Sequence, residues 1–180
     1  MSKDGPDLVR ASKLLSLVLR HDPGALGLSL DPEGWVSMQE LVASSDGRLT
    51  DALVRQIVRE SDKQRFALSE DGSEIRANQG HSLDVNLGLQ PIAPPETLLH
   101  GTAAQFVKAI TAEGLKPGNR QFVHLSADME TAQRVGSRHG RAVVLTIDAA
   151  GMHKSGSSFF RSENGVWLTK YVPVEYIRST

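Results

Sequence analysis

The spacing of apolar residues changes near the middle of this sequence, and that change most limits the folds open to it. Before residue 83 apolar residues recur at helical spacing, whereas after residue 97 short apolar runs typical of strands predominate. The segment between them has no clear periodicity and carries three prolines close together, at positions 91, 94 and 95, which favours a loop. The sequence therefore predicts two lobes and a crossover between them: residues 1–82, residues 98–180 and residues 83–97.

The first lobe is predicted to hold three short helices followed by a β-hairpin. The first helix should end before Pro23, because proline disfavours helix in the residue that precedes it. Ser37 and Glu40 form a capping box that opens the second helix, and an Asp-Gly turn at Gly72 separates the hairpin strands. In chain order the expected elements are helix 7–20, strand Gly34–Val36, a helix from Met38, helix 50–60, and strands 65–68 and 74–78. This order is typical of a winged-helix lobe.

The second lobe is predicted to be rich in strands. Only two helices are expected in it, one opened by a capping box at Thr102 and ending at Gly114, the other capped by Ser126. In the latter, three apolar residues should face inward: Met129, Ala132 and Val135. The expected strands are Thr97–His100, Phe122–Leu125, Val143–Ile147, Phe159–Phe160, Gly165–Leu168 and Glu175–Ile177. The whole chain is therefore predicted to have an α+β fold.

The composition excludes several classes of site. With no cysteine in 180 residues, the chain has no disulfide scaffold, Cys-based zinc site, iron–sulfur cluster or thiol nucleophile. Its six histidines are scattered without metal-ligand spacing, so no metal site is expected. The sequence also contains no Rossmann, P-loop, G-x-S-x-G or H-E-x-x-H motif. A net charge of −1 argues against a general basic field, so any contact with nucleic acid must be local.

The sequence predicts a cytoplasmic protein without a membrane span. No apolar run approaches the ~18 to 20 residues that a membrane-spanning helix needs, and Met1 to Pro6 are polar instead of opening a signal peptide. We expect the protein to be a monomer, although no sequence feature specifies its oligomeric state.

Two groups of polar residues in the first lobe are candidates for a site. Arg20 and His21 end the first predicted helix, where a cationic pair also has the simpler role of interacting with the helix macrodipole. Arg76 lies between Ile75 and Ala77 in a predicted strand, so its side chain should face away from these two apolar residues. The simpler explanation is an arginine on the solvated surface.

The second lobe has further candidates. His100-Gly101-Thr102 is predicted as a strand end that passes into a helix start, whose backbone N–H groups can hold an anion; a plain turn is the alternative. Arg120 lies in a Gly/Pro-rich loop. His124 is a polar residue within the apolar strand that follows, and a core histidine with a backbone hydrogen-bond partner is the simpler explanation for it. Arg138 lies in a basic loop that need have no function.

Several motifs occurring in one order closely resemble the RNA (tRNA) 2′-phosphotransferase family, of the KptA type. The resemblance covers the chain from about Ser12 to Ile177, and its most specific string is Arg-Ala-Asn-Gln-Gly-His-Ser at positions 76–82. The other matching segments are 12–16, Leu19–His21, Gly34–Val36, His100–Thr102, Arg120 with Val123–Ser126, Val135–Gly140 and Asn164–Thr169.

The resemblance implies a winged-helix RNA lobe and a carboxy-terminal, NAD-binding lobe of the ADP-ribosyltransferase type. It also implies a reaction in which an internal RNA 2′-phosphate attacks the nicotinamide-bearing ribose carbon of NAD and expels nicotinamide. The ribose 2″-hydroxyl then attacks the phosphorus of this ADP-ribosylated RNA 2′-phosphate. The products are 2′-hydroxyl RNA and ADP-ribose 1″,2″-cyclic phosphate, and no metal is required.

The family's functional residues fall on definite positions of this sequence. The implied catalytic residues are Arg20, His21, Arg76 and Arg120. Several guanidinium groups suit a phosphate dianion and its transition state, and His21 could steer or protonate in the second step. The implied NAD-binding residues are His100, Gly101, Thr102, His124, Ser126 and Arg138. The chain departs from the family pattern at Leu99, Phe122 and Phe160, which affects contacts around the NAD pocket.

Two alternative functions remain open at this point. One is an ADP-ribosyltransferase that caps a terminal phosphate of RNA or DNA and stops after the first step. The other is a non-enzymatic winged-helix regulator, although its groove-reading third helix would carry acidic residues beside its arginines: Asp51, Glu60 and Asp62 with Arg55 and Arg59. The Glu typical of protein-modifying ADP-ribosyltransferases is not evident, since Glu163 matches no motif, which argues against a protein acceptor.

Overall fold

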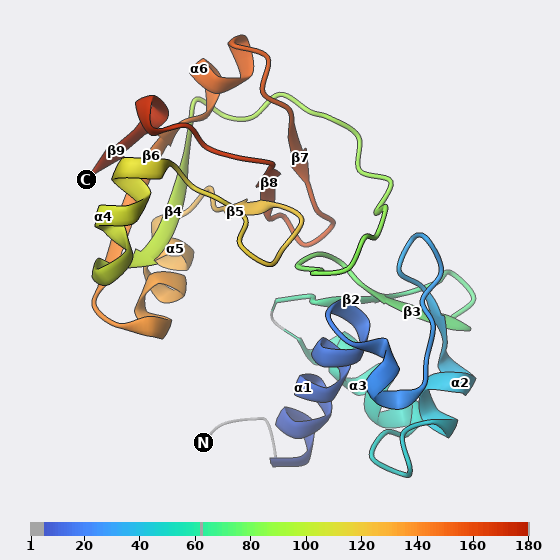
Figure 1. Cartoon of the computed structure of the whole chain (residues 1–180). Helices are drawn as coiled ribbons and strands as arrows, with labels where there is room; N and C mark the ends of the chain where they lie inside the picture. The colour runs from blue at the N-terminus through green and yellow to red at the C-terminus, as the bar shows by residue number, and fades with distance from the viewer. Residues whose placement is uncertain (1–5, 62, 180) are drawn as a thin grey trace. The chain divides into compact units, whose positions relative to one another are not determined.

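The computed structural model describes residues 6–61 and 63–179, so the polar opening of the chain before Pro6, and Asp62, lie outside the described residues. The chain divides into two compact units, Met1–Gly88 and Leu89–Thr180 (Figure 1). Both contain helices beside small antiparallel sheets, so the predicted α+β class is confirmed. Within the described part of the chain, no helix is both long enough and apolar enough to span a bilayer.

The helices of the first unit begin and end close to their predicted limits. They are α1 (Pro6–Arg20), α2 (Met38–Ala43) and α3 (Asp51–Glu60), with a 3-10 turn at Pro23–Leu26. The Ser37 hydroxyl accepts the backbone N–H of Glu40 at 3.4 Å, which confirms the predicted cap. Thr50 caps α3 in the same way, accepting from the N–H of Leu53 at 3.2 Å. These side chains satisfy N–H groups that a helix start leaves without intrahelical partners.

A three-stranded antiparallel sheet completes the first unit. Its strands are β1 (Val36–Ser37), β2 (Phe66–Leu68) and β3 (Glu74–Ala77), in the order β1-β3-β2, which confirms the hairpin. The strand expected at Gly34–Val36 begins only at Val36. Gly34 has a φ of +85°, and the N–H of Trp35 is bound by the Asp31 carboxylate at 2.8 Å instead of a strand partner.

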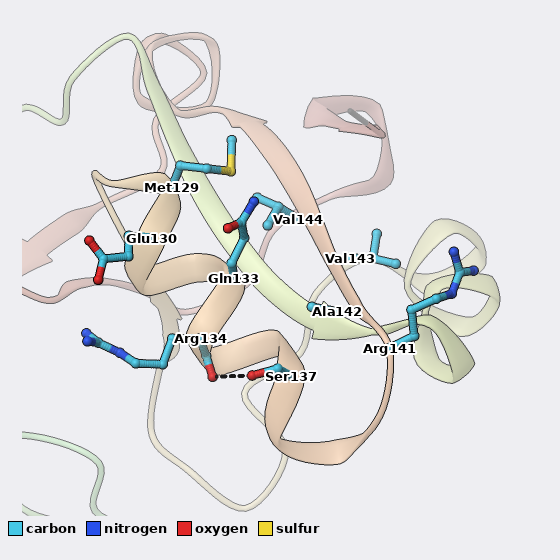
Figure 2. A pocket seen from close by; sticks show the side chains of 9 residues that line it. All are labelled: Met129, Glu130, Gln133, Arg134, Ser137, Arg141, Ala142, Val143 and Val144. Carbon is cyan, nitrogen blue, oxygen red and sulfur yellow. Dashed lines mark hydrogen bonds between the residues drawn. The ribbon is translucent and has the colours of Figure 1, made fainter.

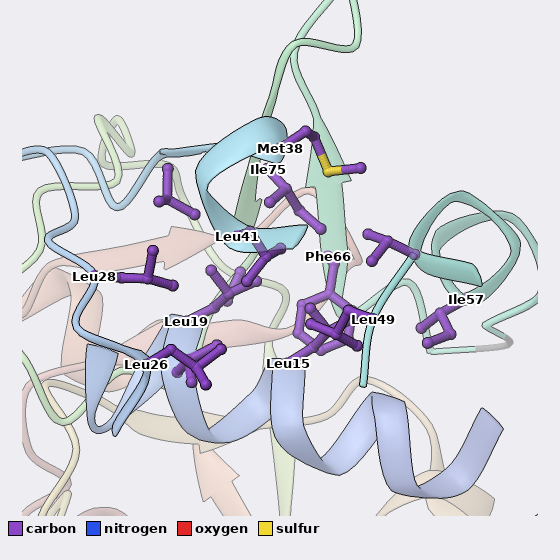
Figure 3. Packing of buried hydrophobic residues seen from close by; sticks show 14 of the residues in the cluster. Leu15, Leu19, Leu26, Leu28, Met38, Leu41, Leu49, Ile57, Phe66 and Ile75 are labelled. Carbon is purple, nitrogen blue, oxygen red and sulfur yellow. The ribbon is translucent and has the colours of Figure 1, made fainter. Parts of the chain in front are cut away.

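The core of the first unit holds the ends of α1 and β3 in place. Leu15 and Leu19 of α1 pack with Phe66 of β2 and Ile75 of β3, and all four are buried (Figure 3). Arg20 follows Leu19, and Arg76 follows Ile75, so the core fixes the backbone from which both guanidinium groups extend. As predicted, Arg76 faces away from the buried apolar residues on either side of it.

Two small antiparallel sheets form the framework of the second unit. The first has the order β4-β6-β9 and the second β5-β8-β7. Their bounds are β4 (Thr97–Ala103), β5 (Val123–Leu125), β6 (Ala142–Asp148), β7 (Phe159–Arg161), β8 (Trp167–Thr169) and β9 (Ile177–Ser179). The first five expected strands are therefore confirmed with shifted ends. The last was placed too early, because Val174–Tyr176 form a 3-10 turn.

The helices of the second unit correct several predictions. The described part of this unit has α4 (Ala104–Glu113), α5 (Met129–Gly136) and α6 (Ala149–Lys154), whereas two helices were expected. The prediction of a capping box at Thr102 is wrong. Thr102 lies inside β4, where it pairs with Val143 of β6, and α4 starts after Ala103, which has no polar side chain. The end of α4 at Gly114 is confirmed.

The N-cap of helix α5 lies two residues after Ser126, which was predicted to cap it. Its N-cap is Asp128, whose carboxylate accepts the N–H of Thr131 at 2.7 Å. The expectation of three inward-facing residues is also wrong. Ala132 is buried, but Met129 and Val135 are 42% and 37% exposed, because the face of α5 that meets β4 is lined by small residues.

Candidate functional site

The candidate residues are distributed over both units. Arg20, His21 and Arg76 belong to the first unit, whereas Arg120 and the six residues expected to bind NAD belong to the second. Two separate polar clusters result, and each is built by a different set of strands and loops.

In the first unit, a loop after β3 holds the end of α1. The backbone N–H of Ser82 donates to the Arg20 carbonyl at 2.9 Å. The Ser82 hydroxyl lies 3.0 Å from Nδ1 of His21. Gly80 passes close to the Arg20 side chain, since a β carbon there would lie 3.7 Å from Nη1 of Arg20. The loop therefore orients two consecutive candidate residues from more than sixty positions away in the sequence.

Aromatic rings and one carbonyl position the two arginines of this cluster. Nη2 of Arg20 donates to the Arg65 carbonyl at 3.3 Å, and its Cζ lies 5.6 Å from the Phe66 ring centroid. Cζ of Arg76 lies 4.5 Å from the ring centroid of Trp35. Such cation–π contacts stabilise a guanidinium in one orientation while it stays charged.

His81 is a member of the first cluster that sequence reasoning missed. Its side chain is 1% exposed, and neither ring nitrogen has a hydrogen-bond partner among the described residues. Burial lowers the pKa of His81 to about 4, and the charges of Arg20, His21 and Arg76 act in the same direction. Arg20, His21 and Arg76 therefore lie near enough to the buried His81 ring to act on its protonation. The signal was the dense polar string Gln79–Ser82, which taken alone predicts only a turn.

In the second unit, His124 connects two other candidates. Nη1 of Arg120 lies 2.7 Å from Nδ1 of His124, and Nδ1 of His100 lies 3.1 Å from the His124 carbonyl. Burial lowers the pKa of His100, although the bond to the His124 carbonyl acts in the opposite direction. Arg120 is exposed as a whole residue, yet desolvation of its guanidinium lowers its pKa, as does the charge of Arg138. Arg120, His124, His100 and Arg138 thus belong to one neighbourhood.

The remaining candidates of this unit have structural surroundings that the sequence did not reveal. The prediction that a helix starts at Thr102 and holds an anion with its backbone N–H groups is wrong, because β4 continues through Thr102 to Ala103. Gly101 instead packs its backbone against α5. Ser126 joins β4 through an exchange of backbone bonds with Leu99, both at 2.8 Å, and its hydroxyl lies 3.1 Å from the Asp128 carboxylate.

Two of the positions that depart from the family pattern meet each other. The rings of Phe122 and Phe160 lie 5.5 Å apart, centroid to centroid, in an edge-to-face arrangement. Nζ of Lys170 lies 4.2 Å from the Phe122 ring centroid. The Phe122 ring, which immediately precedes β5, therefore contacts a ring from β7 and a cation that follows β8.

A pocket of about 840 Å³ lies between α5 and the start of β6. None of the candidate residues is among the described residues that line it: Met129, Glu130, Gln133, Arg134, Ser137, Arg141, Ala142, Val143 and Val144. Figure 2 shows Gln133 pointing toward Val144, whereas Arg134 and Arg141 point in different directions. The two guanidinium groups therefore do not converge on one point of the pocket. Among the described residues, no group of three or more His, Cys, Asp or Glu side chains could hold a metal ion.

Comparison with known proteins shows similarity over almost the whole chain. A model of the family described as "RNA 2′-phosphotransferase, Tpt1 / KptA family" matches residues 6–171. A probable RNA 2′-phosphotransferase of Agrobacterium fabrum is 53% identical over 169 residues, covering 92% of this chain and 91% of the relative. The protein of the same description in Acaryochloris marina is 51% identical over 172 residues, covering 94% and 95%. That of Pectobacterium atrosepticum is 48% identical over 182 residues, covering 99% of each chain.

Proposed function

The chain belongs to the RNA 2′-phosphotransferase, Tpt1 / KptA family, a family of transferase enzymes, and on that premise we propose that it transfers an internal RNA 2′-phosphate to NAD. The observation that best supports this proposal is the gathering of Arg20, His21 and Arg76 around the buried, neutral His81. Two guanidinium groups and an imidazole at one place suit a phosphate monoester, because each guanidinium offers several N–H donors and a full positive charge.

We assign different lobes to the two substrates. The first unit, with three helices and a hairpin, is proposed as a winged-helix lobe that binds RNA, and the second as an ADP-ribosyltransferase-like lobe that binds NAD. Residues 83–97 are proposed as the crossover, and within the described chain residues 83–96 form neither helix nor strand. His100, His124, Ser126 and Arg138 are proposed to contact NAD, while Gly101 and Thr102 support them from β4.

The arginines are proposed to act most strongly in the second of two steps. In the first step a phosphate oxygen bonds to the ribose carbon of NAD as the bond to nicotinamide breaks. In the second, the neighbouring ribose 2″-hydroxyl bonds to phosphorus as the bond to the RNA 2′-oxygen breaks. Negative charge then grows on the phosphoryl oxygens, where Arg20, Arg76 and Arg120 stabilise it. The 2″-hydroxyl loses its proton as it attacks, and His21 supplies a proton to the departing 2′-oxygen, so the step leaves the number of bound protons unchanged.

Product analysis tests the proposal. The protein is incubated with NAD and a short RNA that carries one internal 2′-phosphate, beside the same RNA without that phosphate. We expect nicotinamide, 2′-hydroxyl RNA and ADP-ribose 1″,2″-cyclic phosphate from the first RNA only. Stable ADP-ribosylated nucleic acid would instead identify a capping ADP-ribosyltransferase. The absence of any nicotinamide, together with binding to DNA, would identify a winged-helix regulator.

A further inference from the structure

The contact between Arg120 and His124 defines the tautomer of the histidine. Nη1 of Arg120 and Nδ1 of His124 lie 2.7 Å apart. A guanidinium has five N–H donors and no acceptor, so Nδ1 of His124 must accept. When it is neutral, the ring therefore carries its proton on Nε2. His100 has the opposite arrangement, because its Nδ1 lies 3.1 Å from the His124 carbonyl and must donate to it.

The two partners of this contact differ in how firmly the backbone holds them. His124 is the central residue of β5 and pairs with Leu168 of β8, and both neighbours of His124 along β5 are buried. Its carbonyl is also bound by the His100 ring. Arg120 lies in the loop that follows Pro117, on an exposed stretch of chain. An arginine side chain loses rotamer entropy when it is fixed, and a hydrogen bond to a rigid acceptor offsets part of that loss.

We propose that His124 is a positioning residue, which aims the Arg120 guanidinium through an Nη1–H···Nδ1 hydrogen bond. This inference rests on the proposed function, in which Arg120 acts on the phosphoryl group. It gives His124 a role beyond contact with NAD: the imidazole transmits the rigidity of the β5–β8 pair to a cation on a loop. The charge of Arg138 faces the same guanidinium and repels it, so the acceptor nitrogen of His124 also offsets that repulsion.

A pair of amide variants tests which ring nitrogen matters. The amide oxygen of asparagine reaches the position of Nδ1, whereas that of glutamine extends to the position of Nε2. We expect His124→Asn to keep kcat at saturating NAD within about 3-fold of the wild type, because it keeps the acceptor for Arg120, while its KM for NAD rises with the loss of the imidazole. His124→Gln should lower kcat by roughly 10- to 100-fold relative to His124→Asn, because the loss of one charged hydrogen bond slows the step it serves. The two variants should share a similar KM for NAD, since both lack the imidazole. His153→Gln, at an exposed position of α6, is the matched control and should leave activity unchanged.

The tautomer itself provides a readout that needs no substrate. Two-bond ¹H–¹⁵N spectra of the full-length protein, recorded where the rings are neutral, should show His124 with its proton on Nε2 and His100 with its proton on Nδ1. In Arg120→Met the His124 signals should move toward a mixture of both tautomers, while those of His100 stay.

Three outcomes decide between the proposals. A wild-type His124 ring protonated on Nδ1 would overturn the positioning role, and so would equal losses in the Asn and Gln variants when both remain folded by circular dichroism. If the wild-type protein showed the expected tautomers but released no nicotinamide from NAD, the contact would stand and the proposed function would fail.

Discussion

Gly101 in β4 lies with its backbone directly against the carbonyl group of Ala132 in α5. A β carbon at position 101 would overlap the Ala132 oxygen and lie 2.6 Å from its carbonyl carbon. A second glycine makes the reciprocal approach, since a β carbon at Gly136 would lie 2.7 Å from the Thr102 carbonyl oxygen. Helix α5 therefore meets the strand that carries His100 backbone to backbone, and a methyl group at either glycine would push the two apart.

This approach predicts that Gly101→Ala destabilises the second unit. The obstructing atoms belong to the backbone and cannot turn aside, so we expect a loss of about 3 kcal/mol, at the upper end for overpacking. Urea denaturation measures it. Gly118→Ala is the control, because a β carbon there meets open space and its cost of about 1 to 2 kcal/mol comes only from a φ of +62°. Similar stabilities for the wild type and Gly101→Ala would disprove the packing role.

The cap of α5 makes a second prediction. Asp128→Ala removes the acceptor for the Thr131 N–H and should lower the free energy of unfolding by about 1 kcal/mol. Asp128→Asn keeps an equivalent acceptor and should lose less than about half of that. Urea midpoints of the two variants give the comparison. A harmless Asp128→Ala substitution would return the capping role to Ser126.

The third prediction concerns the pH dependence of stability. His81 has a folded-state pKa of about 4, below the ordinary value of 6.5, so the unfolded chain takes up a proton first as the pH falls. The stability it contributes is fully present above pH ~6.5 and is lost as the pH falls toward 4, in total on the order of 3 kcal/mol. Urea denaturation at pH 7 and at pH 4.5 should show this decline.

Substitution isolates the contribution of His81. In His81→Leu the decline should become shallower, with little change at pH 7, because the ring nitrogens that are removed have no hydrogen-bond partners among the described residues. The pKa of His100 is also lowered, but that residue is present in both proteins and its effect cancels in the difference. An unchanged slope in His81→Leu would refute the assignment.

The fourth prediction separates the two chemical steps. His21→Ala or Arg76→Ala should slow the attack on phosphorus more than the attack on the ribose carbon, so that ADP-ribosylated RNA phosphate accumulates. Loss of a charge-assisted contact of ~1.5 to 3 kcal/mol corresponds to about 10- to 150-fold in rate. Single-turnover reactions resolved on a gel measure both steps. Arg59→Ala, an exposed arginine of the same unit, should behave as the wild type. A slowed first step without an intermediate would contradict the assignment.

Local patterns in the sequence were sufficient for much of the first unit. The Ser37 cap, the Asp-Gly hairpin turn and the end of α1 were all predicted, because each depends on hydrogen bonds or steric limits within about four residues. The outward direction of Arg76 followed from strand alternation in the same way. The resemblance to a known family also came from the sequence alone, carried by the string at positions 76–82.

The tertiary structure decided what depends on distant partners. Thr102 carries the pattern of a helix cap, yet it remains in β4 because Val143 of β6 supplies its strand partner forty-one positions away. His81 is neutral because the fold buries its ring among cations that come from α1 and β3. The tautomer of His124 is set by the approach of Arg120, which no local pattern encodes. Sequence patterns record hydrogen bonds between near neighbours, whereas burial, charge and proton position follow from the atoms that folding brings around a side chain.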